Sequence, residues 1–293
     1  MRKEIRIGTR SSALALWQAE WVKSELEKKY PGMTVSLTKI KTTGDKILDV
    51  PLAKVGGKGL FVKEIEEAML RGEIDIAVHS MKDVPTFFPD GLHLGAITKR
   101  EDARDALISR NKVKFSDLPK GANIGTSSLR RQAQIMSLRP DFVIHQLRGN
   151  VDTRIRKLKE GQFDAIILAA AGVKRLGLAE NVTEYIDPEI SLPAIGQGAI
   201  GIECRADDDE INRILSALHD DETGICVSAE RAMNRRLNGG CQVPIAGFAE
   251  IQDGQLFMRG LVGSPDGSVL YRSERTGHPE QAETIGRLIA EDL

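Results

Sequence analysis

The sequence predicts an α/β protein with two similar lobes, followed by a small α+β C-terminal domain that contains an antiparallel sheet. Short apolar strands alternate with helical segments along the first two thirds of the chain, as in α/β folds. Two turns rich in Ser and Thr, at residues 7–12 and 124–128, each end a strand and open a helix. After about residue 223 one helix is followed by several strand-like segments.

The elements of the first lobe follow from their hydrophobic periodicity. Segments predicted as strands are short and apolar or alternate with a period of two, whereas the helices have apolar residues three or four positions apart. In order, we expect a strand at 5–8, a helix at 11–29, a strand at 34–41, a helix at 61–70 and a buried strand at 74–78.

A weak internal repeat supports the second lobe. The turn at 7–12 resembles that at 124–128, and a helix leads through glycine into a strand at both 72–77 and 161–166. Such turns also occur in any α/β fold, because helix starts favour Ser and Thr. We interpret the repeat as two lobes of similar construction.

Two breaks in the pattern suggest where the chain passes between lobes. Residues 102–105 form a charged break, and 191–198, with a proline and two glycines, offer a return to the first lobe. The predicted domains are 1–99 with 199–217, then 100–198, and finally 218–293. In the last we expect a helix at 227–238, strands at 245–250, 256–260 and 269–273, and a helix from about 279.

Composition excludes several classes of protein. The chain has 41 Lys and Arg against 42 Asp and Glu, a net charge of -1, and 4% aromatic residues, so a nucleic-acid partner is not expected. Its 3 cysteines and 5 histidines lack the spacings of a disulfide framework or a metal site. The first ten residues lack an apolar signal segment, and the longest apolar stretch, near 165–173, is too short to cross a bilayer. We expect a cytoplasmic protein with reduced thiols and neither a metal nor a membrane partner.

The segment 239–244 holds Cys241 behind two glycines and ahead of a Val-Pro step. Glycines allow a tight turn and close approach of a bulky group, while proline stiffens the exit. A thiol on such a loop can be an attachment point or a nucleophile. The alternative is a small buried side chain, because free cysteine is among the most buried residue types.

A local concentration of positive charge lies between residues 126 and 159. Arg130 and Arg131 fall in the first turn of an expected helix, where the helix dipole disfavours cations unless an anion joins them. Arginine grips carboxylates through two parallel hydrogen bonds, which suggests a site for a polycarboxylate or phosphate ligand. A solvated helix face is the alternative, and we favour it for Lys157 and Lys159.

Two further segments carry candidate residues. Lys82 and Asp83 follow the strand at 74–78, and ligands of open α/β sheets bind beyond the carboxyl ends of strands. A carboxylate there can stabilise a developing cation or move a proton, although a surface salt bridge or turn cap is an equal alternative. Residues 56–61 resemble a phosphate loop but lack its spacing, so we expect a mobile loop, with Lys58 as a candidate ligand contact.

Together these segments resemble the porphobilinogen deaminase family, also called hydroxymethylbilane synthases. The matching motifs occur in family order and span nearly the whole chain. They are IGTRSS at 7–12, GKGLF at 57–61, AVHSMKD at 77–83, IGTSSLRR at 124–131, LRGNVDTR at 147–154, LPAIGQG at 192–198 and GGCQVP at 239–244.

The resemblance implies a three-domain fold whose first two domains look like periplasmic-binding-protein lobes. It implies a transferase of tetrapyrrole biosynthesis, monomeric in solution, with a dipyrromethane cofactor attached to Cys241 through a thioether. Four porphobilinogen molecules would be added to that cofactor, each with loss of ammonia, before hydroxymethylbilane is released. A non-catalytic two-lobed anion receptor is the alternative, since one fold serves many functions. A simple receptor gives no reason for the Cys241 loop.

The resemblance also assigns site residues. Asp83 would stabilise the electron-poor methylene-pyrrole cation, while Phe61 and residues 46–59 would cover the site. Cys204 and Cys226 lie outside the motifs and should be structural. Cofactor contacts are expected at Lys82, Thr126, Ser128, Arg130, Arg131, Arg148, Arg154 and Cys241. Substrate contacts are expected at Arg10, Ser12, Gln18, Lys58, Arg148, Arg154 and Arg175.

Overall fold

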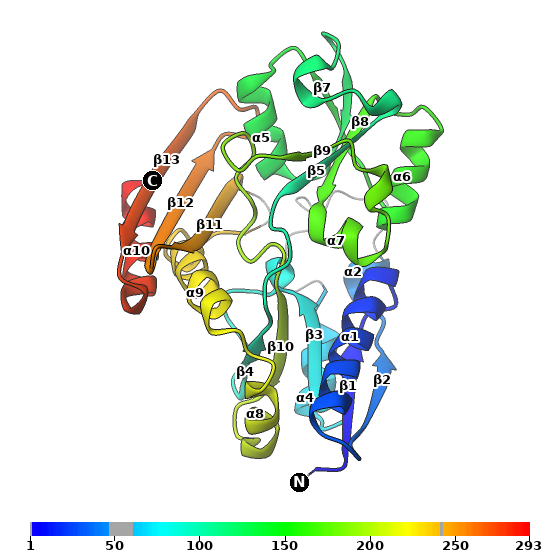
Figure 1. The fold of residues 1–293 in the computed structure, drawn as a ribbon, viewed down its shortest axis with the longest axis vertical. Coiled ribbons are helices and arrows are strands. Elements are labelled where there is room, and N and C mark those ends of the chain that lie inside the picture. Colours follow the sequence, from blue (N-terminus) through cyan, green and yellow to red (C-terminus); the bar gives the residue numbers. More distant parts are fainter. Residues whose placement is uncertain (1, 47–60, 241–242) are drawn as a thin grey trace. The chain divides into compact units, whose positions relative to one another are not determined.

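The computed structural model describes residues 2–46, 61–240 and 243–293 (Figure 1). These residues form two compact units. The first unit contains described residues 2–46, 61–100 and 199–224, and the second contains 101–198, 225–240 and 243–293. The predicted three-domain boundaries stay a prediction.

A five-stranded mixed sheet forms the centre of the first unit, in the order β2-β1-β3-β10-β4. β1 pairs in parallel with β2 and β3, whereas β10 is antiparallel to both β3 and β4. The strands are β1 (Glu4–Thr9), β2 (Thr34–Lys39), β3 (Ile76–Ser80), β4 (Leu92–Ile97) and β10 (Ile200–Arg205).

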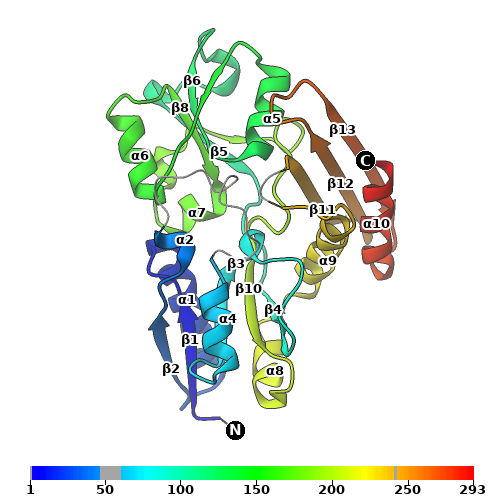
Figure 2. The ribbon, with the colours of Figure 1, turned by 180° about the vertical axis from the view of Figure 1, so that it is seen from behind.

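Helices cover both faces of this sheet (Figures 1 and 2). Helices α1 and α8 pack on one face through an apolar cluster that includes Ile5, Leu26 and Ile211. Helix α4 packs on the other face, where Ile65 and Met69 join a second cluster. The helices are α1 (Ala13–Lys29), α2 (Thr43–Lys46), α4 (Lys63–Leu70) and α8 (Asp209–Ser216), with a short 3-10 helix η1 (Met81–Asp83) after β3.

The first sheet of the second unit repeats this construction, in the order β7-β6-β8-β5-β9. β6 is parallel to β7 and β8, and β5 is antiparallel to β8 and β9. The strands are β5 (Asp105–Ser109), β6 (Asn123–Gly125), β7 (Val143–His145), β8 (Ala165–Ala169) and β9 (Glu184–Ile186). The helices are α5 (Leu129–Leu138), α6 (Val151–Lys159) and α7 (Ala170–Arg175), with 3-10 helices η2 (Arg110–Lys112), η3 (Phe115–Asp117) and η4 (Ala179–Asn181).

The second unit also contains a three-stranded antiparallel sheet in the order β11-β12-β13. Helices α9 and α10 approach closely at Gly286. A side chain does not fit there, because a Cβ at this position would lie 2.1 Å from the carbonyl oxygen of Ala229. The elements are α9 (Asp221–Arg236), β11 (Ile245–Gln252), β12 (Gln255–Gly263), β13 (Leu270–Gly277), η5 (Pro279–Gln281) and α10 (Ala282–Asp292).

The three sheets confirm the predicted fold class, and the matching order of the two five-stranded sheets confirms the internal repeat. Helix α9 begins at Asp221, six residues before the predicted start at 227, because the apolar pattern predicts the buried face of a helix better than its ends. None of the helices in the described part of the chain has the length and apolar character of a membrane span.

Candidate active site

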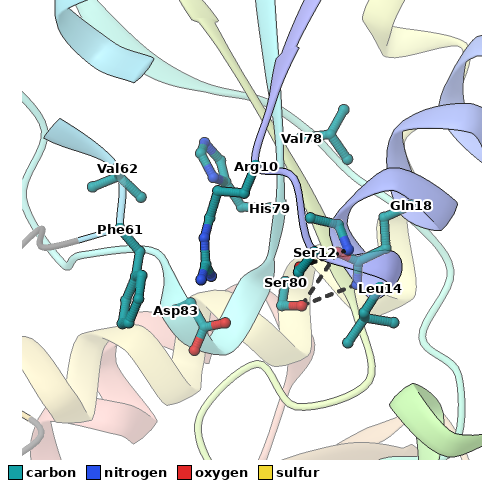
Figure 3. A pocket seen from close by; sticks show the side chains of 11 residues that line it. Arg10, Ser12, Leu14, Gln18, Phe61, Val62, Val78, His79, Ser80 and Asp83 are labelled. Atoms are coloured by element: carbon teal, nitrogen blue, oxygen red, sulfur yellow. Dashed lines mark hydrogen bonds between the residues drawn. The ribbon is translucent and has the colours of Figure 1, made fainter. Parts of the chain in front are cut away.

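A small pocket of about 70 Å³ opens in the first unit, where the carboxyl ends of β1 and β3 meet. Parallel neighbours end at one edge of a sheet, so residues that follow these two strands converge there. Figure 3 shows the side chains that line it. The polar and aromatic ones are Arg10, Ser12, Gln18, Phe61, His79, Ser80 and Asp83.

The pocket brings together four predicted site residues: Asp83, Arg10, Ser12 and Gln18. Asp83 ends the short helix η1, which turns the chain directly after β3. The Arg10 guanidinium extends toward Asp83 and lies 4.1 Å from the centre of the Phe61 ring (Figure 3). The pocket therefore presents a carboxylate, a guanidinium and an aromatic face in one small volume.

Hydrogen bonds fix the opposite wall of the pocket. The Nε2 atom of Gln18 donates to Oγ of Ser80 at 3.0 Å, which connects α1 to the end of β3. Ser12 caps α1, since its Oγ accepts a hydrogen bond from the backbone N–H of Ala15 at 3.3 Å. Because the capping oxygen only accepts, the Ser12 hydroxyl retains its own hydrogen for a ligand.

Behind the pocket wall lies a cluster of buried titratable groups that the sequence analysis missed. His79 and Glu203 are both buried, and Nε2 of His79 lies 3.1 Å from Oε2 of Glu203. Glu66, on α4, is 8% exposed. Burial, followed by the nearby charge of Glu203, raises the pKa of Glu66 to about 7. A glutamate inside the apolar strand β10 was the available signal for this cluster.

The raised pKa makes the stability of the first unit depend on pH. The fold favours the protonated form of Glu66, so its contribution is fully present below about pH 4.5 and is lost as the pH rises through about 7. Glu66→Gln removes this dependence, and we expect it to raise the free energy of unfolding at pH 8 by up to about 3 kcal/mol. Urea unfolding at pH 5 and pH 8 measures the effect. Glu67→Gln, at an exposed position of the same helix, is the control. An equal change for Glu66→Gln at both pH values would contradict the prediction.

In the second unit, Arg130 and Arg131 meet an anion that belongs to the protein. Both arginines are buried, and their guanidinium nitrogens lie 2.9 and 2.7 Å from the carboxylate of Asp105. An anion does join the two arginines, as the helix dipole requires, but Asp105 of the protein supplies it. Contact of either arginine with the cofactor stays a prediction.

Asp105 is the centre of a buried network. Its carboxylate also accepts hydrogen bonds from Ser191 Oγ and Gln197 Nε2, each at 2.9 Å. Burial by itself would raise the pKa of Asp105, but the charges of Arg130 and Arg131 hold it well below its usual range. The network thereby joins β5, α5 and the segment 191–198, one of the two predicted breaks.

The remaining predicted contact residues differ in their hydrogen bonds and in their exposure to solvent. Ser128 caps α5, and its N–H donates to Thr126 Oγ1 at 3.2 Å. Arg154 donates to the Gly149 carbonyl at 2.7 Å, and Arg175 to the Gly198 carbonyl at 2.7 Å. Burial lowers the pKa of Arg175 to about 10. Lys82 is exposed on η1 and Arg148 is half-buried, whereas Lys58 and Cys241 lie outside the described residues.

Comparison with known proteins identifies the family. Residues 5–213 match the model of the porphobilinogen deaminase dipyromethane cofactor binding domain, and residues 224–293 match that of the porphobilinogen deaminase C-terminal domain. The chain belongs to the porphobilinogen deaminase family. The predicted family, enzyme class and dipyrromethane cofactor are confirmed, and the receptor alternative is not favoured.

Relatives within the porphobilinogen deaminase family are similar along nearly the whole chain. Porphobilinogen deaminase of Geotalea uraniireducens is 61% identical over 291 residues, which cover 99% of this chain and 91% of that protein. The Geobacter metallireducens protein of the same name is 62% identical with the same coverage. Among solved structures, the extracellular-binding protein YtmK of Bacillus subtilis aligns with 74% of this chain and 90% of its own at 12% identity and a TM-score of 0.44.

Proposed function

We propose that the chain joins four porphobilinogen molecules, each with loss of ammonia, onto a dipyrromethane group attached through a thioether to Cys241, and then releases hydroxymethylbilane. The observation that carries this proposal is the pocket of the first unit, where Asp83 and Arg10 lie together beyond the carboxyl ends of β1 and β3. A carboxylate beside a guanidinium suits a substrate that bears carboxylates and develops positive charge during the reaction.

The second unit offers groups that fit the carboxylates of the cofactor. Nε of Arg131 is buried without a hydrogen-bond partner among the described residues, although its Nη atoms bond Asp105 and Ile167. Because buried donors normally have a hydrogen-bond partner, this N–H group suits an acceptor on a bound ligand, such as a carboxylate oxygen. When bound, the cofactor supplies the nucleophilic pyrrole carbon on which the chain starts. The residues proposed to hold it are Lys82, Thr126, Ser128, Arg130, Arg131, Arg148, Arg154 and Cys241.

Each residue of the pocket has a proposed role. Arg10 binds a carboxylate side chain of porphobilinogen, and the Ser12 hydroxyl and Gln18 orient it through hydrogen bonds. Asp83 stabilises the positive charge that remains on the methylene-pyrrole when ammonia leaves. Phe61 excludes water, which would otherwise trap that cation. Further carboxylate contacts are proposed for Lys58, Arg148, Arg154 and Arg175.

The intact mass of the denatured protein tests the attachment site. We expect an excess equal to two linked pyrroles, confined to the peptide that contains Cys241 and absent in Cys241→Ser. If the protein is isolated without the excess, incubation with porphobilinogen should create it. A protein that never forms the adduct would refute the proposed function. Cys226→Ser, which alters a buried thiol elsewhere in the second unit, is the matched control and should retain the adduct.

We further propose that the enzyme acts as a monomer in the cytoplasm and requires no metal. The support is the spacing of its cysteines and histidines, which fits neither a disulfide framework nor a metal site. Sedimentation equilibrium at micromolar concentration tests the monomeric state, and an activity assay with and without a chelator tests the metal requirement.

A further inference from the structure

One face of the first sheet carries titratable groups that the proposed mechanism has not used. In the β3–β10 pairing, Glu203 lies opposite Ala77 and Gly201 lies opposite His79. Side chains two positions apart on a strand share a face, so Ala77, His79 and Glu203 all point to the same side of the sheet. Helix α4 packs there, since Ile65 and Met69 form a cluster with Ala77. Glu66, on the same helix, is buried against this side.

The groups that face one another are therefore Glu66 from α4, Glu203 from β10 and His79 from β3. His79 lines the same pocket as Arg10 and Asp83, and its ring lies beside the backbone end of the Arg10 side chain, whereas the Arg10 guanidinium extends away from it toward Asp83 (Figure 3). Ionising both buried carboxylates would cost free energy, because burial and mutual repulsion disfavour two negative charges. In addition, Oε1 of Glu203 is buried without a hydrogen-bond partner among the described residues. A proton held within the cluster would satisfy that oxygen.

The proposed reaction generates a proton at this place. The substrate amine reacts in its ammonium form: the C–N bond breaks with its electron pair on nitrogen, neutral ammonia leaves, and a pyrrole carbon supplies the pair for the new C–C bond. The C–H bond of that carbon then returns its pair to the ring as the proton leaves. Each link thus releases ammonia and one proton, which together make one ammonium ion, and the proton needs an acceptor until it reaches solvent or ammonia.

We infer that Glu66, Glu203 and His79 form a buried proton store, in which His79 takes up the proton released at each condensation and the two carboxylates stabilise it until it leaves. This inference rests on the proposed function of the pocket. His79 is the acceptor because it alone of the three lines the pocket. Its ring is held by Glu203, and an ionised Glu66 would add a second negative charge on the same side of the sheet. The carboxylates are thus positioning residues for His79.

The raised pKa of Glu66, about 7, gives the store a measurable signature. Above about pH 7 Glu66 is ionised and places a second negative charge near His79, whereas below this pH that charge is lost. For Glu66→Gln holoenzyme we expect kcat to fall about tenfold at pH 8, with little change at pH 6 and an unchanged KM. Glu67→Gln, which removes an exposed carboxylate from the next position of α4, should retain the unmodified profile.

A spectroscopic measurement separates the store from a structural role. In ¹⁵N-histidine-labelled holoenzyme without substrate, the chemical shifts of the His79 ring nitrogens should report the ionisation of Glu66 near pH 7, and this change should disappear in Glu66→Gln and persist in Glu67→Gln. Three results would overturn the inference. For Glu66→Gln these are a loss of kcat that is equal at pH 6 and pH 8, an unchanged dependence of kcat on pH, and a His79 signal that is the same as in the unmodified enzyme. If Glu66→Gln does not retain its cofactor by mass, His79→Gln serves instead, with an expected loss in kcat of about a hundredfold and normal cofactor content.

Asp83→Asn, assayed in parallel, distinguishes failure of the proposed function from failure of the proton store. Normal turnover in Asp83→Asn would mean that the pocket is not the reaction site, and the proposed function of the pocket would fail. Loss of turnover in Asp83→Asn with an unchanged Glu66→Gln profile would overturn only the proton store.

Discussion

Asp83→Asn is expected to lower kcat by about a thousandfold while leaving the fold and the cofactor content intact. An ionised carboxylate beside a developing cation contributes most in a pocket that excludes water, and removal of one such electrostatic group costs about a hundredfold to a thousandfold. The Asp83 side chain is exposed at the mouth of the pocket, on a three-residue turn, so its replacement should leave packing unchanged. Ammonia release under saturating porphobilinogen measures kcat, and intact mass reports the cofactor.

Asp90→Asn is the matched control for Asp83→Asn. Asp90 is also exposed on a turn of the first unit, just before β4, and does not line the pocket. Its replacement should leave kcat within a factor of about two, the scatter expected for a surface change. A rate for Asp83→Asn within threefold of the unmodified enzyme would refute the role of Asp83.

The second large effect is expected on stability. Asp105→Asn should lower the free energy of unfolding of the second unit by about 3–5 kcal/mol, because it leaves Arg130 and Arg131 buried without a counter-charge. Thermal unfolding, with hydrogen exchange of the β5 and β8 amides, measures the loss. Asp117→Asn, an exposed position on η3 of the same unit, should change stability by less than about 0.5 kcal/mol.

The sign of the pH dependence gives a second check on Asp105. Its pKa lies below the ordinary value, so its contribution is present above about pH 4 and is lost as the pH falls further. The stability difference between the unmodified protein and Asp105→Asn should thus stay constant from pH 7 to about pH 4. A difference that vanished between pH 7 and 5 would contradict the ion pairs.

Arg131→Leu distinguishes the internal role of this arginine from a role toward the cofactor. If Arg131 only balances Asp105, the variant should be less stable but should carry a full cofactor at a temperature where it remains folded. We propose cofactor contact as well, and so expect incomplete loading by intact mass even in the folded fraction. Full loading and an unmodified rate would count against the contact.

Much of the fold was predictable because its signals are local. Ser12 marks the start of α1 through its capping hydroxyl, and the turns at 7–12 and 124–128 mark equivalent positions of two sheets with the same strand order. Asp83 was placed beyond the end of its strand from the sequence, whereas Arg10 was assigned only through the resemblance; the two meet because parallel neighbouring strands end at one edge. Helix ends, such as the start of α9 at Asp221, were less accurate because propensity changes little there.

The charged interior could not be predicted in the same way. Arg130 and Arg131 lie 25 and 26 residues from Asp105, and His79 lies 124 residues from Glu203. In the sequence Asp105 belongs to an ordinary charged break, and Glu203 is a single acid within an apolar strand. Neither position reveals its partner, because a charge pattern does not specify which groups lose water together.

The sequence by itself determined the fold class, the order of the motifs and, through them, the family. It did so because hydrophobic periodicity, caps and turns act over a few residues. The tertiary structure decided which charges are buried and with which partners, namely Asp105 with its two arginines and Glu203 with His79. Burial and charge pairing depend on segments far apart in the chain, and their energies exist only once those segments have met.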